Sequence, residues 1–162
     1  MAAILLPLMG GLAQAQSGTE TEMTEAERVA RAYMEAYSNV DFDAMGQLMA
    51  EDIVFEDPTS IPAGHSGIHR EGREAVLQGF REFEQRDHPI TLGLQWGIVY
   101  ESNDRVIFMG QVQARFPSRQ RNRDVIWASP QTSVVTVEDG RVVHHVDYAD
   151  YDNARQGLVD SQ

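Results

Sequence analysis

Glu56 and Asp57 form an acidic pair at the end of a short β-rich run, directly before Pro58. Side chains alternate between the two faces of a strand, so we expect Asp57 on the apolar face with Phe55, and Glu56 on the opposite face. A carboxylate among apolar side chains suits a general base, because desolvation favours its taking up a proton. The alternative is that Asp57 only caps the turn at Pro58.

A second pair, His145 and Asp147, lies in an alternating stretch near the C-terminus. Their i,i+2 spacing places both side chains on one face of a strand. There the Asp can fix the tautomer of the His, or the two can act as acid and base. The alternative is a polar strand face in contact with solvent.

Tyr33 lies on the apolar stripe of an expected helix. A buried tyrosine hydroxyl needs a hydrogen-bond partner, and it can donate to an oxyanion that develops on a substrate. The alternative is a core tyrosine whose hydroxyl is satisfied within the protein.

Three other histidines, His65, His69 and His88, lie in or beside expected loops. His65 and His69 are four residues apart, but both fall in a stretch expected to be a loop rather than a helix, and no His-Glu-x-x-His motif occurs. We therefore expect no metal, and a metal-dependent protein that uses these three histidines is only a third hypothesis.

Four arginines crowd one predicted turn: Arg115, Arg119, Arg121 and Arg123. They form either a solvated hairpin tip or a clamp for an anionic ligand or partner. Trp96 and Trp127 fall within β-rich runs, so we expect them to pack in the core or to line a pocket.

The composition limits the chemistry to carboxylates, histidine, hydroxyl groups and arginine. The 162 residues include no Cys, which excludes disulfides and thiolate metal sites. They also include no Lys, which excludes Schiff-base chemistry and a phosphate-loop lysine. A formal net charge of -12 argues against nucleic acid as a partner, because like charges repel.

The first 15 residues have the pattern of a cleaved secretory signal peptide. An apolar run from Ala2 to Leu12 is followed by the small-x-small triplet Ala13-Gln14-Ala15. We therefore expect an exported protein, periplasmic or secreted, with no membrane span in its mature form. Residues 16–23 would be a flexible lead-in, residues 24–158 the folded domain and residues 159–162 a tail.

Three helices and a set of strands are expected to position these groups. Apolar residues at helical spacing predict helices at about 24–38, from Asp41 onward and at about 72–85. A short strand at 53–55 precedes a loop at 58–72 that is rich in Gly and Pro. Longer β-rich runs follow at 90–101, 104–117, 122–138 and 141–151, the last two joined by the hairpin signal Asp139-Gly140. This order predicts an α+β domain whose curved antiparallel sheet wraps around the helices and leaves a pocket.

The order of these motifs resembles the nuclear transport factor 2-like superfamily, and most closely its SnoaL-like and ketosteroid-isomerase-like enzymes. The resemblance rests on Val-Ala-Arg-Ala-Tyr at 29–33, Asp-Phe-Asp-Ala at 41–44, Phe-Glu-Asp-Pro at 55–58, Gly-Arg-Glu-Ala at 72–75 and the run 140–150. It covers residues 24–158 and implies a cone-shaped fold with an apolar cavity open at one end.

The resemblance also implies roles for single residues. Tyr33 and Asp57 match the tyrosine and the Asp base of ketosteroid isomerases, and Ser133 stands where those enzymes have a second Asp. Asp147 matches the acid of the final strand in limonene epoxide hydrolase and the SnoaL-like cyclases. No complete catalytic set of one branch is present, so the predicted site is a mixture of two.

Two functions therefore remain open. In the first, the exported protein binds a small apolar, cyclic, carbonyl-bearing molecule; Asp57 moves a proton, Tyr33 donates to the enolate oxygen, and His145 with Asp147 lies across the cavity. Residues expected to contact the substrate are Phe55, Phe80, Trp127 and Ser133. No cofactor is needed, because carboxylates and a tyrosine suffice for proton abstraction beside a carbonyl. The alternative is a non-catalytic ligand-binding or dimerising module; the resemblance implies a homodimer through the outer sheet face in either case.

Overall fold

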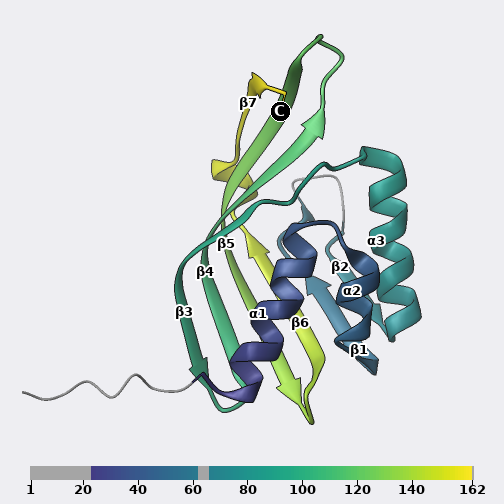
Figure 1. Ribbon diagram of the computed structural model, residues 1–162, viewed down its shortest axis with the longest axis vertical. Coiled ribbons are helices and arrows are strands. Elements are labelled where there is room, and N and C mark those ends of the chain that lie inside the picture. Colours follow the sequence, from purple (N-terminus) through teal and green to yellow (C-terminus); the bar gives the residue numbers. More distant parts are fainter. Residues whose placement is uncertain (1–22, 62–65, 162) are drawn as a thin grey trace, which may run out of the picture.

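The computed structural model describes residues 23–61 and 66–161 as three helices and one seven-stranded sheet (Figure 1). The helices are α1 (Glu25–Ser38), α2 (Phe42–Gln47) and α3 (Arg73–Asp87). The strands are β1 (Met49–Asp57), β2 (Ile68–Glu71), β3 (Leu94–Ser102), β4 (Arg105–Pro117), β5 (Arg123–Glu138), β6 (Arg141–Ala149) and β7 (Arg155–Asp160). A short 3-10 helix, η2 (Tyr151–Asn153), connects β6 to β7.

Local sequence signals explain where the helices begin and end. The Thr24 side chain accepts a hydrogen bond from the Glu27 backbone N–H at 3.1 Å and so caps α1, as expected from the capping-box pattern. Asp41 caps α2 in the same way through the Ala44 N–H at 2.9 Å. Helix α3 ends at His88, which adopts the left-handed conformation at a φ of 50°.

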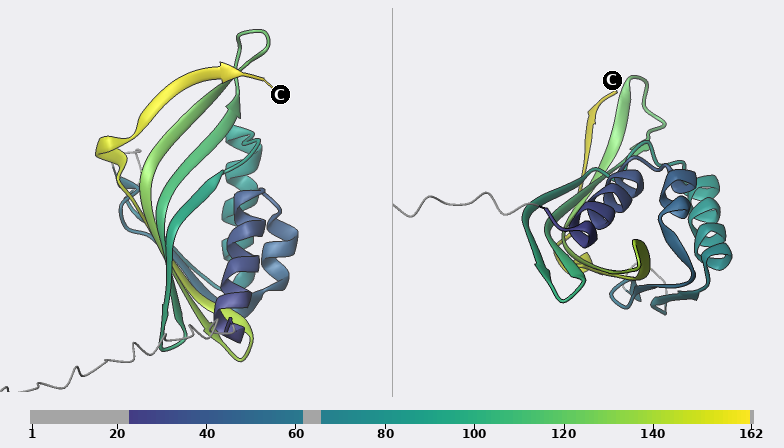
Figure 2. Two further views of the ribbon diagram at one scale, coloured as in Figure 1. Left: turned by 60° about the vertical axis from the view of Figure 1, so that its left-hand side comes forward. Right: turned by 60° about the horizontal axis from the view of Figure 1, so that its bottom comes forward.

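The sheet is strongly bent, and all three helices lie against its concave side (Figure 2). Its strand order is β2-β1-β6-β5-β4-β3, with β7 paired to the first half of β5. Every pairing is antiparallel except that of β1 with β6, which is parallel. The expected α+β cone, a curved sheet wrapped around three helices, is confirmed.

Three details of the expected strands are wrong. The first strand, β1, has nine residues instead of three. Strand β2 lies inside the stretch expected as a loop at 58–72. Strand β6 ends at Ala149 rather than at residue 151, and the additional strand β7 follows it. The first half of β1 carries two consecutive exposed acids, Glu51 and Asp52, so its sequence lacks the alternation of apolar and polar residues that predicts a strand. Both β2 and β7 are held by pairing with distant strands, a non-local cause that short-range patterns do not report.

The core and a cavity share the space inside the cone. Along β4, Val106 and Phe108 are buried against α1, whereas Val112 and Ala114, farther along the same face, line the cavity. Helix α1 therefore fills the part of the cone near the β3–β4 turn and leaves the other part open.

Within the described residues, no helix has the length and apolar character needed to cross a membrane. The expected signal peptide at residues 1–15 lies outside the described part of the chain.

Candidate functional site

A cavity of about 540 Å³ lies between α3 and the concave face of the sheet. This is the size range of pockets for small organic molecules. Most of its wall is apolar, with side chains from β1, α3, β4 and β5: Phe55, Val76, Phe80, Phe83, Leu92, Leu94, Val112, Ala114, Phe116 and Trp127. One group of polar side chains converges on it: Tyr37, Asp57, Gln131, Asp147 and Tyr151. The lining also includes Ser60, Arg70, Glu82, Arg86 and Asp87. An apolar wall with a few convergent polar groups is the usual form of a small-molecule site.

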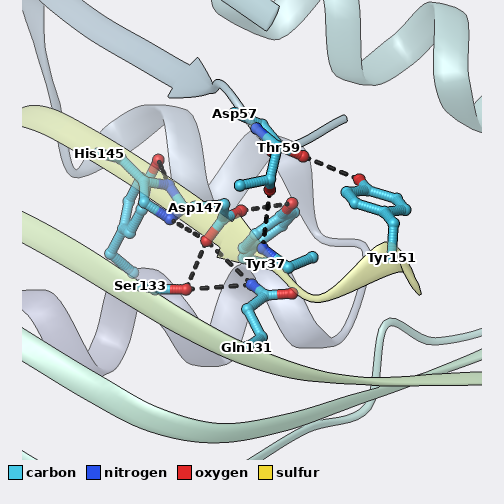
Figure 3. A network of polar contacts seen from close by, with 10 residues as sticks. Tyr37, Asp57, Thr59, Gln131, Ser133, His145, Asp147 and Tyr151 are labelled. Atoms are coloured by element: carbon cyan, nitrogen blue, oxygen red, sulfur yellow. Dashed lines mark hydrogen bonds and ion pairs between the residues drawn. The ribbon is translucent and has the colours of Figure 1, made fainter. Parts of the chain in front are cut away.

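Asp57 ends β1 with its side chain on the interior face, as the alternation predicts. Its Oδ1 accepts hydrogen bonds from the Thr59 backbone N–H at 3.0 Å and from the Thr59 hydroxyl at 2.7 Å. Its Oδ2 accepts one from the Tyr151 hydroxyl at 2.8 Å (Figure 3). Asp57 therefore caps the turn that contains Pro58 through Oδ1, and its carboxylate also lines the cavity, while its role as a base stays a prediction.

No cationic side chain among the described residues is bonded to Asp57, although Arg70 lines the same cavity. Asp57 is 6% exposed, and no ion pair joins it to any described residue. Its three hydrogen bonds come from a peptide group and two neutral hydroxyls. A buried carboxylate oriented by three hydrogen bonds at a cavity wall has the position that a general base requires.

Asp147 also lines the cavity, but its carboxylate is fully used by the protein. Oδ1 accepts hydrogen bonds from His145 Nε2 at 3.0 Å, from Gln131 Nε2 at 2.9 Å and from the Ser133 hydroxyl, and Oδ2 accepts one from the Tyr37 hydroxyl at 3.2 Å (Figure 3). Burial alone would raise the pKa of Asp147, but the charge of His145 and the hydrogen bonds from His145, Ser133 and Tyr37 outweigh it and lower that pKa. Asp147 thus stays ionised and anchors its neighbours.

His145 and Tyr33 lie behind Asp147, away from the cavity. Both are completely buried, and neither is among the residues that line the cavity. The Tyr33 hydroxyl is 3.1 Å from His145 Nδ1. His145 Nε2 bonds to Asp147 and Nδ1 bonds to the Tyr33 hydroxyl, so both ring nitrogens are partnered within the protein. His145 and Asp147 are thus buried, and the alternative of a polar strand face in contact with solvent is wrong.

The tyrosine that reaches the cavity from α1 is Tyr37, one helical turn after Tyr33. Burial and then the charge of Asp147 raise the pKa of both hydroxyls well above the ordinary tyrosine value. Burial, the charge of Asp57 and the hydrogen bond to Asp57 likewise raise the pKa of Tyr151. All three hydroxyls are therefore kept as proton-bearing donors at neutral pH.

The other residues expected to contact substrate divide into two groups. Phe55, Phe80 and Trp127 line the cavity, as expected. Ser133 does not, because it is fully buried with its hydroxyl donating to Asp147. The catalytic and binding roles assigned to all these residues from the sequence stay predictions.

Sequence reasoning missed Tyr37, Tyr151, Thr59 and Gln131 as site residues. Tyr37 had a usable signal, since it lies four residues after Tyr33 on the same helical stripe. Tyr151 also had one, because it follows Asp147 and Ala149 at a spacing of two and stays on their side after the strand ends.

His69 and His88 do not lie close enough together to form a site. His69, on β2, precedes α3, and His88 caps its far end, so about 20 Å of helix separates them. His69 is instead bonded to Glu56 and Glu71 on the outside of the sheet, and Glu56 also contacts His144. His65 lies outside the described residues. Within residues 23–61 and 66–161, no group of three or more metal-ligating side chains is arranged to hold a metal ion.

The arginine cluster is partly structural. Arg115 pairs with Asp124 at 2.7 Å and donates to the carbonyl oxygen of Asp160 at 2.8 Å. Arg123 donates to the carbonyl oxygens of Val159 and Leu158, so both arginines hold β7 against the sheet. Arg119 and Arg121 are exposed at the tip of the β4–β5 hairpin. Trp96 packs on the core residue Phe108 with ring centroids 5.4 Å apart, and Trp127 lies 5.6 Å from the ring of Tyr151.

Comparisons with known proteins agree with this geometry. The SnoaL-like domain family matches residues 30–145 of the chain. No curated protein sequence matches the chain. These 116 residues begin within α1, end in the middle of β6 and include Asp57, Tyr37 and His145, while Asp147 and Tyr151 lie just beyond.

Solved structures with the same fold include two proteins described as candidate SnoaL-like polyketide cyclases. The one from Shewanella putrefaciens CN-32 is 20% identical, with a TM-score of 0.68 over 90% of this chain and 94% of that one. The one from Shewanella denitrificans OS-217 is 16% identical, with a TM-score of 0.66 over 78% and 91%. An epoxide hydrolase of M. tuberculosis, described as LEH-like, is 21% identical, with a TM-score of 0.58 over 82% and 87%. The chain belongs to the SnoaL-like domain family, with the nuclear transport factor 2-like fold of that family.

Proposed function

We propose that the cavity binds a small, apolar, cyclic molecule with a carbonyl group, and that Asp57 moves a proton at the carbon next to that carbonyl. One observation carries the proposal. Asp57 is a buried carboxylate on the wall of a mostly apolar cavity, held only by neutral hydrogen-bond donors. Such a group can take a proton from a weak carbon acid once water is excluded.

In this mechanism Asp57 removes a proton from the carbon beside the carbonyl. The electron pair of the broken C–H bond moves toward the carbonyl oxygen, and an enolate forms. Asp57 then returns the proton to the same carbon or to another carbon of the enolate. Thr59 holds Oδ1 with two hydrogen bonds, so the carboxylate keeps its orientation through both transfers.

We assign the donor to the enolate oxygen to Tyr37, not to the Tyr33 expected from the sequence. Tyr37 lines the cavity, and its hydrogen bond to Asp147, at 3.2 Å, is the longest of the four that Asp147 accepts. Turning this hydroxyl to the substrate leaves Asp147 with its other three donors. Tyr33 and His145 are then positioning residues, because they act only through Asp147.

Deuterium exchange at the α-carbon of 2-tetralone, a two-ring cyclic ketone, tests this function without knowledge of the natural substrate. The full chain is incubated with the ketone in D₂O, and loss of the α-proton signal is followed by NMR. We expect faster exchange than in buffer, inhibition by excess 2-naphthamide, and loss in Ala114→Trp, which fills the cavity wall. Exchange at the buffer rate while 2-naphthamide still binds would favour the alternative, a non-catalytic binding module.

We also propose that two copies associate through the outer face of the sheet. A row of outward-facing side chains crosses four neighbouring strands there: Ile98 pairs with Met109, Met109 with Thr132, and Thr132 with Tyr148. Ile98, Met109 and Tyr148 are exposed, and Thr132 between them is half-buried. Clustered exposed apolar side chains favour association. Equilibrium sedimentation should give a dimer that Met109→Glu dissociates; a wild-type monomer would contradict this.

Export is a third proposal, based on the residues 1–15 alone. In a bacterial host, the N-terminal sequence of the protein recovered outside the cytoplasm should begin at Gln16. Recovery of only the uncleaved chain from the cytoplasm would refute it.

A further inference from the structure

Arg70 differs from the other arginines of the chain in its surroundings. Four arginines make no hydrogen bond and no ion pair within the described residues: Arg70, Arg119, Arg121 and Arg155. Three of these are exposed, so water solvates them. Arg70 is half-buried and lines the cavity, which leaves a cation without a counter-ion at the wall of an apolar space.

The fold turns Arg70 toward the inside of the cone. On the short strand β2 it pairs with Phe55 of β1, and side chains at paired positions share a face. Its neighbours His69 and Glu71 point outward, where they bond to each other. Asp57, two residues after Phe55, lies on the same interior face. Arg70 and Asp57 are therefore neighbouring groups on one wall of the cavity.

Gly79, in the middle of α3, provides the seat for the guanidinium group. A Cβ atom at this position would lie 2.7 Å from Cζ of Arg70, closer than atoms can approach. Glycine is unfavourable in a helix interior compared with alanine. Here its missing side chain lets the guanidinium lie directly against the helix, beside Phe80 and Phe83 on the cavity wall.

None of the acidic residues that line the cavity forms an ion pair with Arg70. Asp57, on the same wall, accepts its three hydrogen bonds from Thr59 and Tyr151. Asp87 is bound by Arg86 through two hydrogen bonds, at 2.9 and 2.6 Å. Asp147 is saturated by its four donors. Glu82 is exposed and accepts from Gln78 at 2.9 Å. Residues 62–65, outside the described part, contain no acidic side chain.

We infer that the ligand of the cavity carries a carboxylate, and that Arg70, seated on Gly79, binds it. A guanidinium offers parallel N–H donors that match the two oxygens of a carboxylate. The apolar body of the ligand then lies on Phe80 and the neighbouring wall, and a carbon near its carbonyl comes within reach of Asp57. The proposed function names a carbonyl-bearing apolar molecule for this same cavity; the present inference rests on it for the place of binding and adds the ligand's charge.

Two aromatic probes of nearly equal shape separate charge from fit. The Kd values of 2-naphthoate, which is anionic at pH 7, and of neutral 2-naphthamide are measured by calorimetry on the full chain at low salt. We expect the naphthoate to bind about tenfold more tightly, the effect of one charge-assisted contact. Arg70→Gln should remove this preference and leave the Kd of the naphthamide unchanged. Arg119→Gln, on the exposed hairpin tip, is the matched control and should change neither value.

Gly79→Ala gives an independent test that does not touch the charge. The new methyl group displaces the guanidinium, while alanine favours the helix, so the variant should lose the naphthoate preference without losing thermal stability. Equal affinity of the two probes for the wild type, or a naphthoate preference that survives in Arg70→Gln, overturns the inference.

The same probes distinguish this inference from the proposed proton transfer. Asp57→Asn removes the base, but it should keep the naphthoate preference because Arg70 is intact. If the wild type fails to exchange the protons of 2-tetralone and still prefers the naphthoate, the proton-transfer role falls and the Arg70 site stands. If neither probe binds, both are refuted.

Discussion

The hydroxyl of Tyr151 donates a hydrogen bond to Oδ2 of Asp57 at 2.8 Å, although the two residues are 94 positions apart in the chain. Thr59 links the same regions a second time, because its hydroxyl donates to Asp57 and accepts from the Ala149 backbone N–H at 2.9 Å. The end of β1 and the end of β6 are thereby joined at the cavity wall. Asp57 is thus held at a fixed place by neutral groups from both ends of the domain.

Tyr151→Phe should leave most of the proposed activity in place. The variant loses the donor to Oδ2, but the two bonds from Thr59 still hold Oδ1. We expect α-proton exchange of 2-tetralone to stay within about tenfold of the wild-type rate, the loss typical of one positioning contact. Exchange that stops completely in this variant, with 2-naphthamide binding intact, would show that Tyr151 itself carries the reaction.

Three tyrosine hydroxyls should resist ionisation in the folded protein. The raised pKa values of Tyr33, Tyr37 and Tyr151 mean that the folded state holds these protons above about pH 10, where an unfolded chain releases them. The folded state then binds more protons than the unfolded state, so stability falls as the pH rises past that value. Phenolate absorbance of native and denatured protein checks this. Ionisation of all five tyrosines of the native chain at about pH 10 would contradict it.

Asp147→Asn should destabilise the protein strongly, since it removes the ionised centre of the buried network. Asp147 is 4% exposed, and an amide in its place would set an N–H group against donors. We expect a loss of about 3 kcal/mol at pH 7 in denaturant unfolding, whereas the exposed Asp52→Asn should change stability by less than about 0.5 kcal/mol.

The cost of Asp147→Asn should also depend on pH. The pKa of Asp147 is lowered in the folded state, so its stabilising contribution is complete above the unfolded value of about 3.9 and is lost as the pH falls below it. The difference between wild type and variant should therefore shrink in acid. A difference that stays constant down to about pH 2 would mean that lost packing, not the carboxylate charge, explains the destabilisation.

On the outer face of the sheet, His69 should titrate above its ordinary range. Hydrogen bonds to Glu71 and then to Glu56 raise the pKa of His69. By NMR titration, Glu71→Gln should lower this pKa, and Glu56→Gln should lower it by a smaller amount. An unchanged His69 titration in both variants would show that these carboxylates do not hold the ring in solution.

The sequence was informative wherever local patterns decide the structure. Period-2 alternation placed Asp57 inward on β1 and put His145 with Asp147 on one face of β6, and both placements are confirmed. Helical spacing and capping residues located the helices to within a few residues. The order of these elements predicted the α+β class, and the family resemblance predicted the cone-shaped fold.

What the sequence could not provide depends on pairing between distant strands. Arg70 falls in a stretch that reads as a Gly- and Pro-rich loop, and only its pairing with Phe55 makes it a strand residue that faces inward. Tyr33 and Tyr37 share one apolar stripe, and the curvature of the sheet decides that Tyr37 reaches the cavity while Tyr33 lies behind His145. Depth behind a curved sheet is a three-dimensional property that periodicity does not encode.

The measurement that tests the account most directly is the α-proton exchange rate of 2-tetralone in Asp57→Asn. Asp52→Asn is the matched control, because it makes the same chemical change on the same strand at an exposed position. We expect the exchange rate of Asp57→Asn to fall to the buffer rate, a loss of about a hundredfold or more for a general base. This variant should still bind 2-naphthamide, and Asp52→Asn should exchange like the wild type. Exchange at the wild-type rate in Asp57→Asn would contradict the central claim that this carboxylate moves the proton.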